Sequence, residues 1–239
     1  MNTDRGVWCV VPAAGVGERF GGSTPKQYAI VNGHAVLWHT LHRLGSHPDV
    51  AGIVLVLAAD DELWREHLGN AGETGYPTSR PVHLATGGHT RADSVLAGLE
   101  AIPSEVGPEA FVMVHDAARP CVRHADISAL LEAVGDGDGG LLATPVADTL
   151  KRADAEQHVA STEPRQAYWR AQTPQMFRRD ALTAALTAAR VAGIAITDEA
   201  MAMEHAGTAP LLVAGSEDNI KITHRVDLAV AGYLLENQA

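Results

Sequence analysis

Short apolar runs alternate with helix-like segments along most of the chain, and this alternation limits the fold more than any other feature of the sequence. The first run, Val7–Val11, is continuous and ends in Pro12, as is typical of a strand buried on both faces. Further strand-like runs cover residues 52–58, 82–85, 111–115, 140–144 and 210–214. Helix-like segments cover residues 35–44, 61–68, 91–101, 125–134, 179–192, 198–206 and 226–236. The pattern predicts an α/β fold with a mostly parallel sheet and helices on both faces.

The alternation lapses between Pro145 and Arg170, where the sequence is polar, has β-prone pieces and lacks a long apolar run. We therefore predict one domain over residues 1–239, with residues 145–170 as an excursion from its core. A surface loop is the alternative interpretation, although long loops without secondary structure are uncommon in compact domains.

Charge and composition limit the partners. Eighteen Lys and Arg residues against 29 Asp and Glu residues give a net charge of −11, which opposes binding to nucleic acid or to an anionic membrane. A few local cations can still bind a small anion. No apolar run approaches the roughly 20 residues that span a bilayer, and the N-terminus does not resemble a signal peptide, so we expect a cytoplasmic protein. Cys9 and Cys121 are expected to be reduced and buried.

Ligands of parallel sheets bind beyond the carboxyl ends of the strands, which directs attention to the loops after Val11, Ala85 and Val114. The first loop is rich in glycine and carries two cations, Arg19 and Lys26, so we predict that it binds phosphate. It is neither a P-loop, which would end in Gly-Lys-Ser/Thr, nor a dinucleotide-binding loop, which would have a third glycine where Phe20 stands. A glycine turn with solvated charges remains the alternative.

The other two loops carry the same kind of signal. Residues 86–94 again place glycines between a strand and a helix and could face the same ligand, although a plain turn capped by Thr90 would look alike. Asp116 would lie at the carboxyl edge of its strand, where it could bind hydroxyls or a metal, or simply form a turn. His39 and His42 share a helix face, but without a third ligand we expect a solvated face rather than a metal site.

Seven motifs in series resemble the 2-C-methyl-D-erythritol 4-phosphate cytidylyltransferases of the non-mevalonate isoprenoid pathway. They are PAAGVGERFGGSTPKQY, GGHTRADSVLAGL, VHDAARPCV, PVADTLKR, AQTPQMF, TDEAMAMEHAG and DNIKIT, and they run from about Val7 to Ala231. The resemblance implies a single Rossmann-like nucleotidyltransferase domain that transfers CMP from CTP to 2-C-methyl-D-erythritol 4-phosphate and releases pyrophosphate. One departure lies at 223–227, where the family often has a proline before the acidic residue, and it affects only the expected start of the last helix.

The resemblance also implies roles for individual residues. In the family, the residues that match Arg19 and Lys26 stabilise the transition state, and those that match Arg165 and Lys221 hold the methylerythritol phosphate. The implied nucleotide-binding residues are Ala13, Ala14, Gly15, Gly17, Gly88 and Ser94. The implied substrate-binding residues, besides Arg165 and Lys221, are Asp116, Arg119, Thr149, Thr197 and Thr223.

Mg²⁺ or another divalent cation is expected, because it neutralises triphosphate oxygens, and Asp116 is the candidate protein contact. The family further implies that the excursion is a β-arm for dimerisation, which would deliver Thr149 and Arg165 to the active site of a partner subunit in a homodimer. Two other functions stay open. One is a cytidylyltransferase for another polyol phosphate, such as ribitol 5-phosphate, and the other is a nucleotide-binding regulator without catalytic activity.

Overall fold

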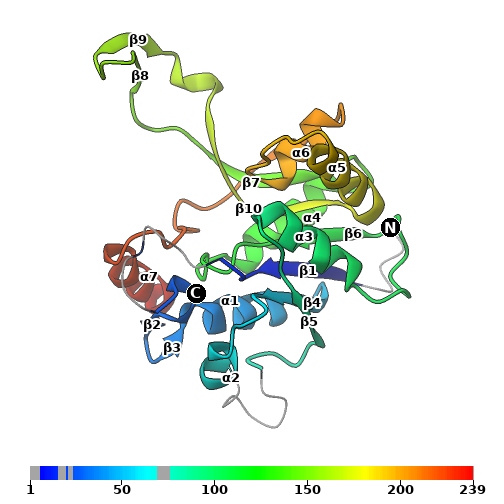
Figure 1. Ribbon diagram of the computed structural model, residues 1–239. Coiled ribbons are helices and arrows are strands. Elements are labelled where there is room, and N and C mark those ends of the chain that lie inside the picture. Colours follow the sequence, from blue (N-terminus) through cyan, green and yellow to red (C-terminus); the bar gives the residue numbers. More distant parts are fainter. Residues whose placement is uncertain (1–5, 16–19, 21–23, 69–75, 239) are drawn as a thin grey trace.

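A seven-stranded sheet forms the centre of the protein (Figure 1), whose computed structural model describes residues 6–15, 20, 24–68 and 76–238. The strand order is β11-β7-β10-β6-β1-β4-β5. These strands are β1 (Val7–Pro12), β4 (Val50–Leu57), β5 (Val82–Thr86), β6 (Phe111–Val114), β7 (Gly140–Pro145), β10 (Trp169–Arg178) and β11 (Leu211–Ala214). Because β1 pairs in parallel with both β4 and β6, and β4 with β5, the predicted parallel sheet is confirmed.

One strand of this sheet was not predicted from the sequence. β10 lies between β6 and β7 and runs antiparallel to both. Its register shifts between Ala171 and Gln175, around Pro174, which cannot donate a backbone hydrogen bond to the sheet. The strand escaped detection because Gln172, Thr173 and Gln175 are polar although they are buried.

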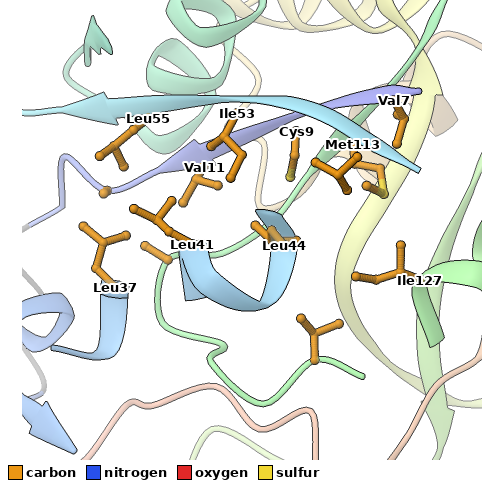
Figure 2. Packing of buried hydrophobic residues seen from close by; sticks show 14 of the residues in the cluster. Val7, Cys9, Val11, Leu37, Leu41, Leu44, Ile53, Leu55, Met113 and Ile127 are labelled. Atoms are coloured by element: carbon orange, nitrogen blue, oxygen red, sulfur yellow. The ribbon is translucent and has the colours of Figure 1, made fainter. Parts of the chain in front are cut away.

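Helices cover both faces of the sheet, as predicted. They are α1 (Val36–Gly45), α2 (Leu63–Leu68), α3 (Arg91–Glu100), α4 (His124–Val134), α5 (Arg179–Val191), α6 (Glu199–His205) and α7 (Val226–Asn237). Alternate side chains of β1 enter different clusters, with Cys9 and Val11 facing α1 and α4, and Val10 facing α3, α5 and α6. Figure 2 shows the first cluster, in which Leu41 and Leu44 of α1 lie under β1 and β4. Both cysteines are buried and free.

Helix α3 packs closely against the sheet at Gly98. A Cβ atom added to Gly98 would come within 2.4 Å of Cγ1 of Val10, so only glycine allows this approach. Just before this helix, Gly87 of the loop after β5 lies against Ala14 of the loop that follows β1. Two of the candidate ligand loops thus meet close to the start of this helix.

A third, smaller cluster lies under α7 and includes Phe20, Cys121 and Ile222. The hairpin of β2 (Ile30–Val31) and β3 (His34–Ala35) lies beside α7, and Asn32 Nδ2 donates to the Gly232 carbonyl at 2.8 Å. The start of α7 needs no proline, because the Asp227 carboxylate accepts hydrogen bonds from the backbone N–H groups of residues 223 and 224 at 2.7 and 2.8 Å.

The polar stretch forms a two-stranded hairpin of β8 (Leu150–Ala153) and β9 (Val159–Glu163), which stands away from the sheet and its helices (Figure 1). A short 3-10 turn at Arg165–Ala167 follows it and leads into β10. We call the segment 145–170 the arm, although its two ends belong to the central sheet, where Trp169 pairs with Pro145 and Arg170 with Thr144. Most of its side chains between 147 and 170 are exposed. None of the helices that the structure describes is both long enough and apolar enough to span a membrane.

Candidate active site

A pocket of about 220 Å³ opens where β1, β5 and β6 end. Eight of the residues singled out from the sequence line it: Ala13, Ala14, Gly15, Lys26, Gly88, Ser94, Asp116 and Lys221. The remaining described lining residues are Pro12, Gln27, His89, Thr90, Arg91, Ala117 and Ala118. Two more candidates, Gly17 and Arg19, lie outside the described residues. All three predicted ligand loops thus contribute to one cavity.

The backbone of the first loop is fixed by the side chain of Gln27, which was not among the residues predicted from the sequence. Gln27 is buried, and its Nε2 donates to the carbonyl oxygens of Ala13 at 2.9 Å and Gly15 at 3.2 Å. Tyr28 secures the same segment from beneath, because its hydroxyl donates to Asp61 Oδ2 at 2.6 Å. Gln27 therefore determines the course of the backbone that lines the pocket, and the neighbouring Lys26 is attached to a fixed support.

The second loop combines both functions that the sequence left open. Thr90 and Asp93 form a reciprocal capping box at the start of α3, so the capped turn is real. The same turn lines the pocket, where the Ser94 hydroxyl donates to the Thr90 carbonyl at 3.0 Å and accepts from the Gly88 N–H at 3.2 Å. A Cβ atom on Gly87 would lie 2.5 Å from Cβ of Ala14, so glycine lets the two loops touch.

Asp116 is the electrostatic centre of the pocket, because three cations surround its carboxylate. Arg91 Nη2 lies 3.0 Å from Oδ1, and Lys221 Nζ lies 2.8 Å from Oδ2. Arg119 Nε is 3.6 Å from Oδ2, too far for a hydrogen bond. Burial alone would raise the pKa of the Asp116 carboxyl, but the charges of Arg91, Lys221 and Arg119 hold that pKa well below its usual range. Asp116 is therefore ionised throughout the physiological pH range.

The backbone of Asp116 is held from behind by a buried chain of hydrogen bonds. Its N–H donates to Thr173 Oγ1 at 3.0 Å, and Thr173 Oγ1 lies 3.1 Å from His115 Nδ1. His115 Nε2 is 3.0 Å from the Arg119 carbonyl, which can only accept, so Nε2 carries the proton and Nδ1 accepts from Thr173. Burial lowers the pKa of His115 to about 4, which keeps the imidazole neutral.

The residues that hold the other side of Asp116 were not predicted from the sequence. Arg91, the first residue of α3, also binds Glu199 of α6, with Nη1 2.6 Å from Oε1 and Nη2 3.2 Å from Oε2. Burial would lower the pKa of the Arg91 guanidinium, but Glu199 and Asp116 raise it above its usual value. Both residues fall inside recognised motifs, GGHTRADSV and TDEAMAMEH, and the only signal was an arginine and a glutamate beside residues already singled out.

Five of the implied substrate-binding residues do not line this pocket. Arg119 lies next to it, with Nη1 donating to the Asn219 carbonyl at 2.6 Å, while its buried Nε has no hydrogen-bond partner. Thr223 Oγ1 donates to the Lys221 carbonyl at 3.0 Å, and the exposed Thr197 lies just before α6. Thr149 and Arg165 are exposed on the arm, where Arg165 donates to the Ala147 carbonyl.

The donor atoms of the pocket limit how a metal could be held. Asp116 is the only carboxylate among the described lining residues, and cations already surround it. The described part of the chain contains no cluster of three or more His, Cys, Asp or Glu side chains that could hold a metal ion. His39 and His42 do not form such a site, since each places a ring nitrogen near a carbonyl, of Val31 at 2.7 Å and of Pro77 at 3.1 Å. The donor set therefore suits a cation that arrives with most of its ligands on a phosphorylated substrate.

Comparisons with known proteins agree with the motif series. The family model for 2-C-methyl-D-erythritol 4-phosphate cytidylyltransferase matches residues 7–237. A protein of that name from Stenotrophomonas maltophilia is 51% identical over 235 residues, covering 98% of both chains. A crystal structure of a 4-diphosphocytidyl-2C-methyl-D-erythritol synthase aligns with a TM-score of 0.81 at 34% identity, over 97% of this chain and 99% of that one. A second crystal structure, of the cytidylyltransferase from Francisella tularensis, aligns with a TM-score of 0.77 at 33% identity, over 96% and 99% of the two chains.

Proposed function

The chain belongs to the 2-C-methyl-D-erythritol 4-phosphate cytidylyltransferase family, and we propose that it transfers CMP from CTP to 2-C-methyl-D-erythritol 4-phosphate, forming 4-diphosphocytidyl-2-C-methyl-D-erythritol and pyrophosphate. One observation of the pocket carries the proposal. A backbone loop of small residues and the side chains of Lys26 and Lys221 meet in one cavity of a protein whose net charge is −11. Cations concentrated in this way suit a reaction between two phosphorylated substrates.

The reaction requires placement and charge compensation rather than a covalent intermediate. An oxygen of the acceptor phosphate attacks the α-phosphorus of CTP, and pyrophosphate leaves with the electron pair of the bond that breaks. The two substrates repel each other, and negative charge grows on the oxygens around the α-phosphorus. Lys26, together with Arg19, is proposed to stabilise this charge. Lys221 and Arg165 are proposed to hold the acceptor phosphate for attack.

The nucleotide is proposed to bind where the first two loops touch. Ala13, Ala14 and Gly15 line the cavity with small side chains, and Gly88 and Ser94 line it from the second loop. Gly17, which lies outside the described residues, is assigned to the same site by its place in the motif. Small side chains admit a pyrimidine ring, and backbone groups can recognise its edge. The first loop would at the same time present N–H groups to the triphosphate.

The acceptor is proposed to bind around Asp116, whose carboxylate can accept hydrogen bonds from polyol hydroxyls. Arg119, Thr197 and Thr223 lie on segments next to this carboxylate or to its partners Lys221 and Arg91, which supports their assignment to the acceptor. Thr149 and Arg165 stand on the arm. The arm projects from the core, and this supports a homodimer in which it completes the acceptor site of the partner subunit.

A divalent cation, Mg²⁺ in the first instance, is proposed as the cofactor. When bound, it neutralises triphosphate oxygens. Asp116 is the residue of this chain that would contact it, and the rest of its ligands would be phosphate oxygens and water, because Arg91 and Lys221 already compensate the charge of this carboxylate. The proposed partners are thus two small-molecule substrates and a second copy of the chain, in the cytoplasm, without nucleic acid or membrane.

A panel of acceptors tests this function against its nearest rival. Purified protein with CTP and Mg²⁺ should release pyrophosphate with methylerythritol phosphate and much less with ribitol 5-phosphate. Release with ribitol 5-phosphate and none with methylerythritol phosphate would transfer the activity to the other polyol. A protein that binds CTP but releases no pyrophosphate with any polyol phosphate would be the regulator considered above.

A further inference from the structure

Glu199 is a buried carboxylate outside the pocket, and the proposed reaction gives it no role. The backbone amide and side-chain carboxylate of Glu199 lie at the start of α6, and the residue is fully buried, with 0% of its surface exposed. Its described ion-pair partner is Arg91, which binds both of its oxygens. A buried carboxylate is costly unless it is paired, so Arg91 and Glu199 depend on each other.

Glu199 is not needed to begin the helix on which it lies. The N-terminus of α6 is capped by Asp198, whose Oδ1 accepts from the Met201 N–H at 3.0 Å. Gln175 of β10 supports the same turn, since its Oε1 accepts from the Ala200 N–H at 2.8 Å and its Nε2 donates to Asp198 Oδ2 at 3.0 Å. The groups that fix this helix end are therefore separate from the Glu199 carboxylate, which is turned toward Arg91 instead.

Arg91 passes this constraint on to the pocket. With Nη1 held by Glu199, the guanidinium directs Nη2 and Nε at the same oxygen of Asp116, Oδ1, at 3.0 and 3.3 Å. Oδ2 is left for Lys221, 2.8 Å away. The two oxygens of Asp116 are thus divided between two cations. The division depends on Arg91 staying where Glu199 holds it, because an untethered guanidinium could turn toward Oδ2 or toward a bound phosphate.

We propose that Glu199 is a positioning residue of the acceptor site, which acts through Arg91 to orient Asp116 and thereby Lys221. The inference rests on the proposed function, because Asp116 and Lys221 belong to the acceptor side of that reaction. It assigns Glu199 a larger effect on the polyol phosphate, which Asp116 is proposed to bind directly, than on CTP, which Asp116 would contact only through the divalent cation. Neither Glu199 nor the start of α6 lines the cavity against the glycine-rich loop, so at saturating Mg²⁺ the binding of CTP should depend on them much less than the binding of the acceptor.

Steady-state kinetics of pyrophosphate release, with CTP and methylerythritol phosphate varied in turn, test this inference. Glu199→Gln keeps the shape of the side chain and removes its charge. We expect the KM for methylerythritol phosphate to rise by about tenfold, as is typical when a residue that supports a functional group is lost. The KM for CTP should stay within about twofold of wild type. Glu204→Gln, which removes an exposed carboxylate from the same helix, is the matched control and should change neither constant.

Two further variants separate positioning from a general structural effect. Arg91→Lys keeps a charge beside Glu199, so folding should survive, but one ammonium cannot span two carboxylates, and the same acceptor-specific rise is expected. In an Asp116→Asn background, Glu199→Gln should add nothing to the acceptor KM, because the group through which it acts is gone. An equal rise in both KM values, an unchanged acceptor KM in Arg91→Lys, or the same effect of Glu199→Gln in both backgrounds would overturn the inference. A wild-type protein without activity would instead refute the proposed function.

Discussion

Replacing Asp116 by asparagine removes the negative charge on which three cations converge. Arg91 and Lys221 lie within hydrogen-bond distance of the carboxylate, at 3.0 and 2.8 Å, and Arg119 lies at 3.6 Å. Asparagine has nearly the same volume and keeps one acceptor oxygen, so the substitution weakens the cluster without opening a cavity. Stability and acceptor binding should both fall, and the loss of stability can be worked out from the contacts.

A hydrogen bond to a charged group contributes about 1.5–3 kcal/mol to stability. Asparagine can still satisfy one of the two close cations, and the side chains of Arg91 and Lys221 are 27% and 39% exposed, so solvent screens part of the loss. We therefore expect Asp116→Asn to lower the free energy of unfolding by about 2 kcal/mol, the contribution of one such bond. For a chain of this length, that corresponds to a fall in Tm of about 4–8 °C.

The pKa of Asp116 sets how this difference depends on pH. Burial alone would raise that pKa, and the charges of Arg91, Lys221 and Arg119 outweigh burial and lower it. A carboxyl whose pKa is lower in the folded than in the unfolded chain stabilises the fold above its unfolded pKa of about 3.9 and loses this contribution as the pH falls through its folded pKa. The difference in stability between wild type and variant should stay constant from about pH 8 to about pH 5 and shrink only below about pH 4.

Thermal unfolding followed by circular dichroism at several pH values measures both quantities. Asp138→Asn, the same substitution at an exposed aspartate, is the control and should leave Tm unchanged. A Tm for Asp116→Asn equal to that of wild type would mean that the cluster does not stabilise the fold. A difference that already changes between pH 8 and pH 5 would contradict the lowered pKa.

Two further predictions test other parts of the site. Gln27→Ala removes two hydrogen bonds to the first loop, at 2.9 and 3.2 Å, and should raise the KM for CTP by about tenfold or more, because each bond contributes about 1 kcal/mol. Steady-state kinetics should show that the acceptor KM is unchanged. A change in the acceptor KM alone would contradict the assignment of this loop to the nucleotide. Lys26→Ala and Arg165→Ala should each be nearly inactive alone, whereas re-paired mixtures of the two should recover about a quarter of wild-type activity if the arm completes the site of the partner subunit. Mass spectrometry of differently tagged chains must first verify the mixed dimers, and verified dimers without such recovery would place Arg165 in the site of its own chain or outside the reaction.

The apolar part of the fold could be predicted because its signal is local. Val7–Val11 is buried on both faces of the sheet, as its continuous apolar sequence predicts. β10 could not be predicted in the same way. Gln172, Thr173 and Gln175 lie in the middle of a central strand, where they are buried. Their polar groups form hydrogen bonds with groups far away in the sequence, Gln172 with Ser216, Thr173 with His115 and Gln175 with Asp198. Polar residues at buried positions hide a strand from a search for apolar runs.

The residues of the site likewise fall into those with a local sequence signal and those without one. Glycines and cations after a buried strand identified the pocket, because parallel strands bring such loops to one edge of the sheet. Gln27, Arg91 and Glu199 gave no signal of their own, since the roles of these residues consist of contacts with groups that only the folded chain brings near. The proposed roles of Thr149 and Arg165 depend on a second subunit, and no sequence pattern within one chain describes such contacts.

The oxygen of the new phosphate–phosphate bond tests the central claim most directly. Methylerythritol phosphate labelled with ¹⁸O in its three non-bridging phosphate positions is incubated with the protein, CTP and Mg²⁺. The masses of the products are then measured by mass spectrometry. Attack by the acceptor phosphate on the α-phosphorus predicts 4-diphosphocytidyl-2-C-methyl-D-erythritol that retains all three labels, beside unlabelled pyrophosphate. Label in the pyrophosphate, or CMP and pyrophosphate formed while the labelled acceptor remains unchanged, would contradict cytidylyl transfer to this phosphate.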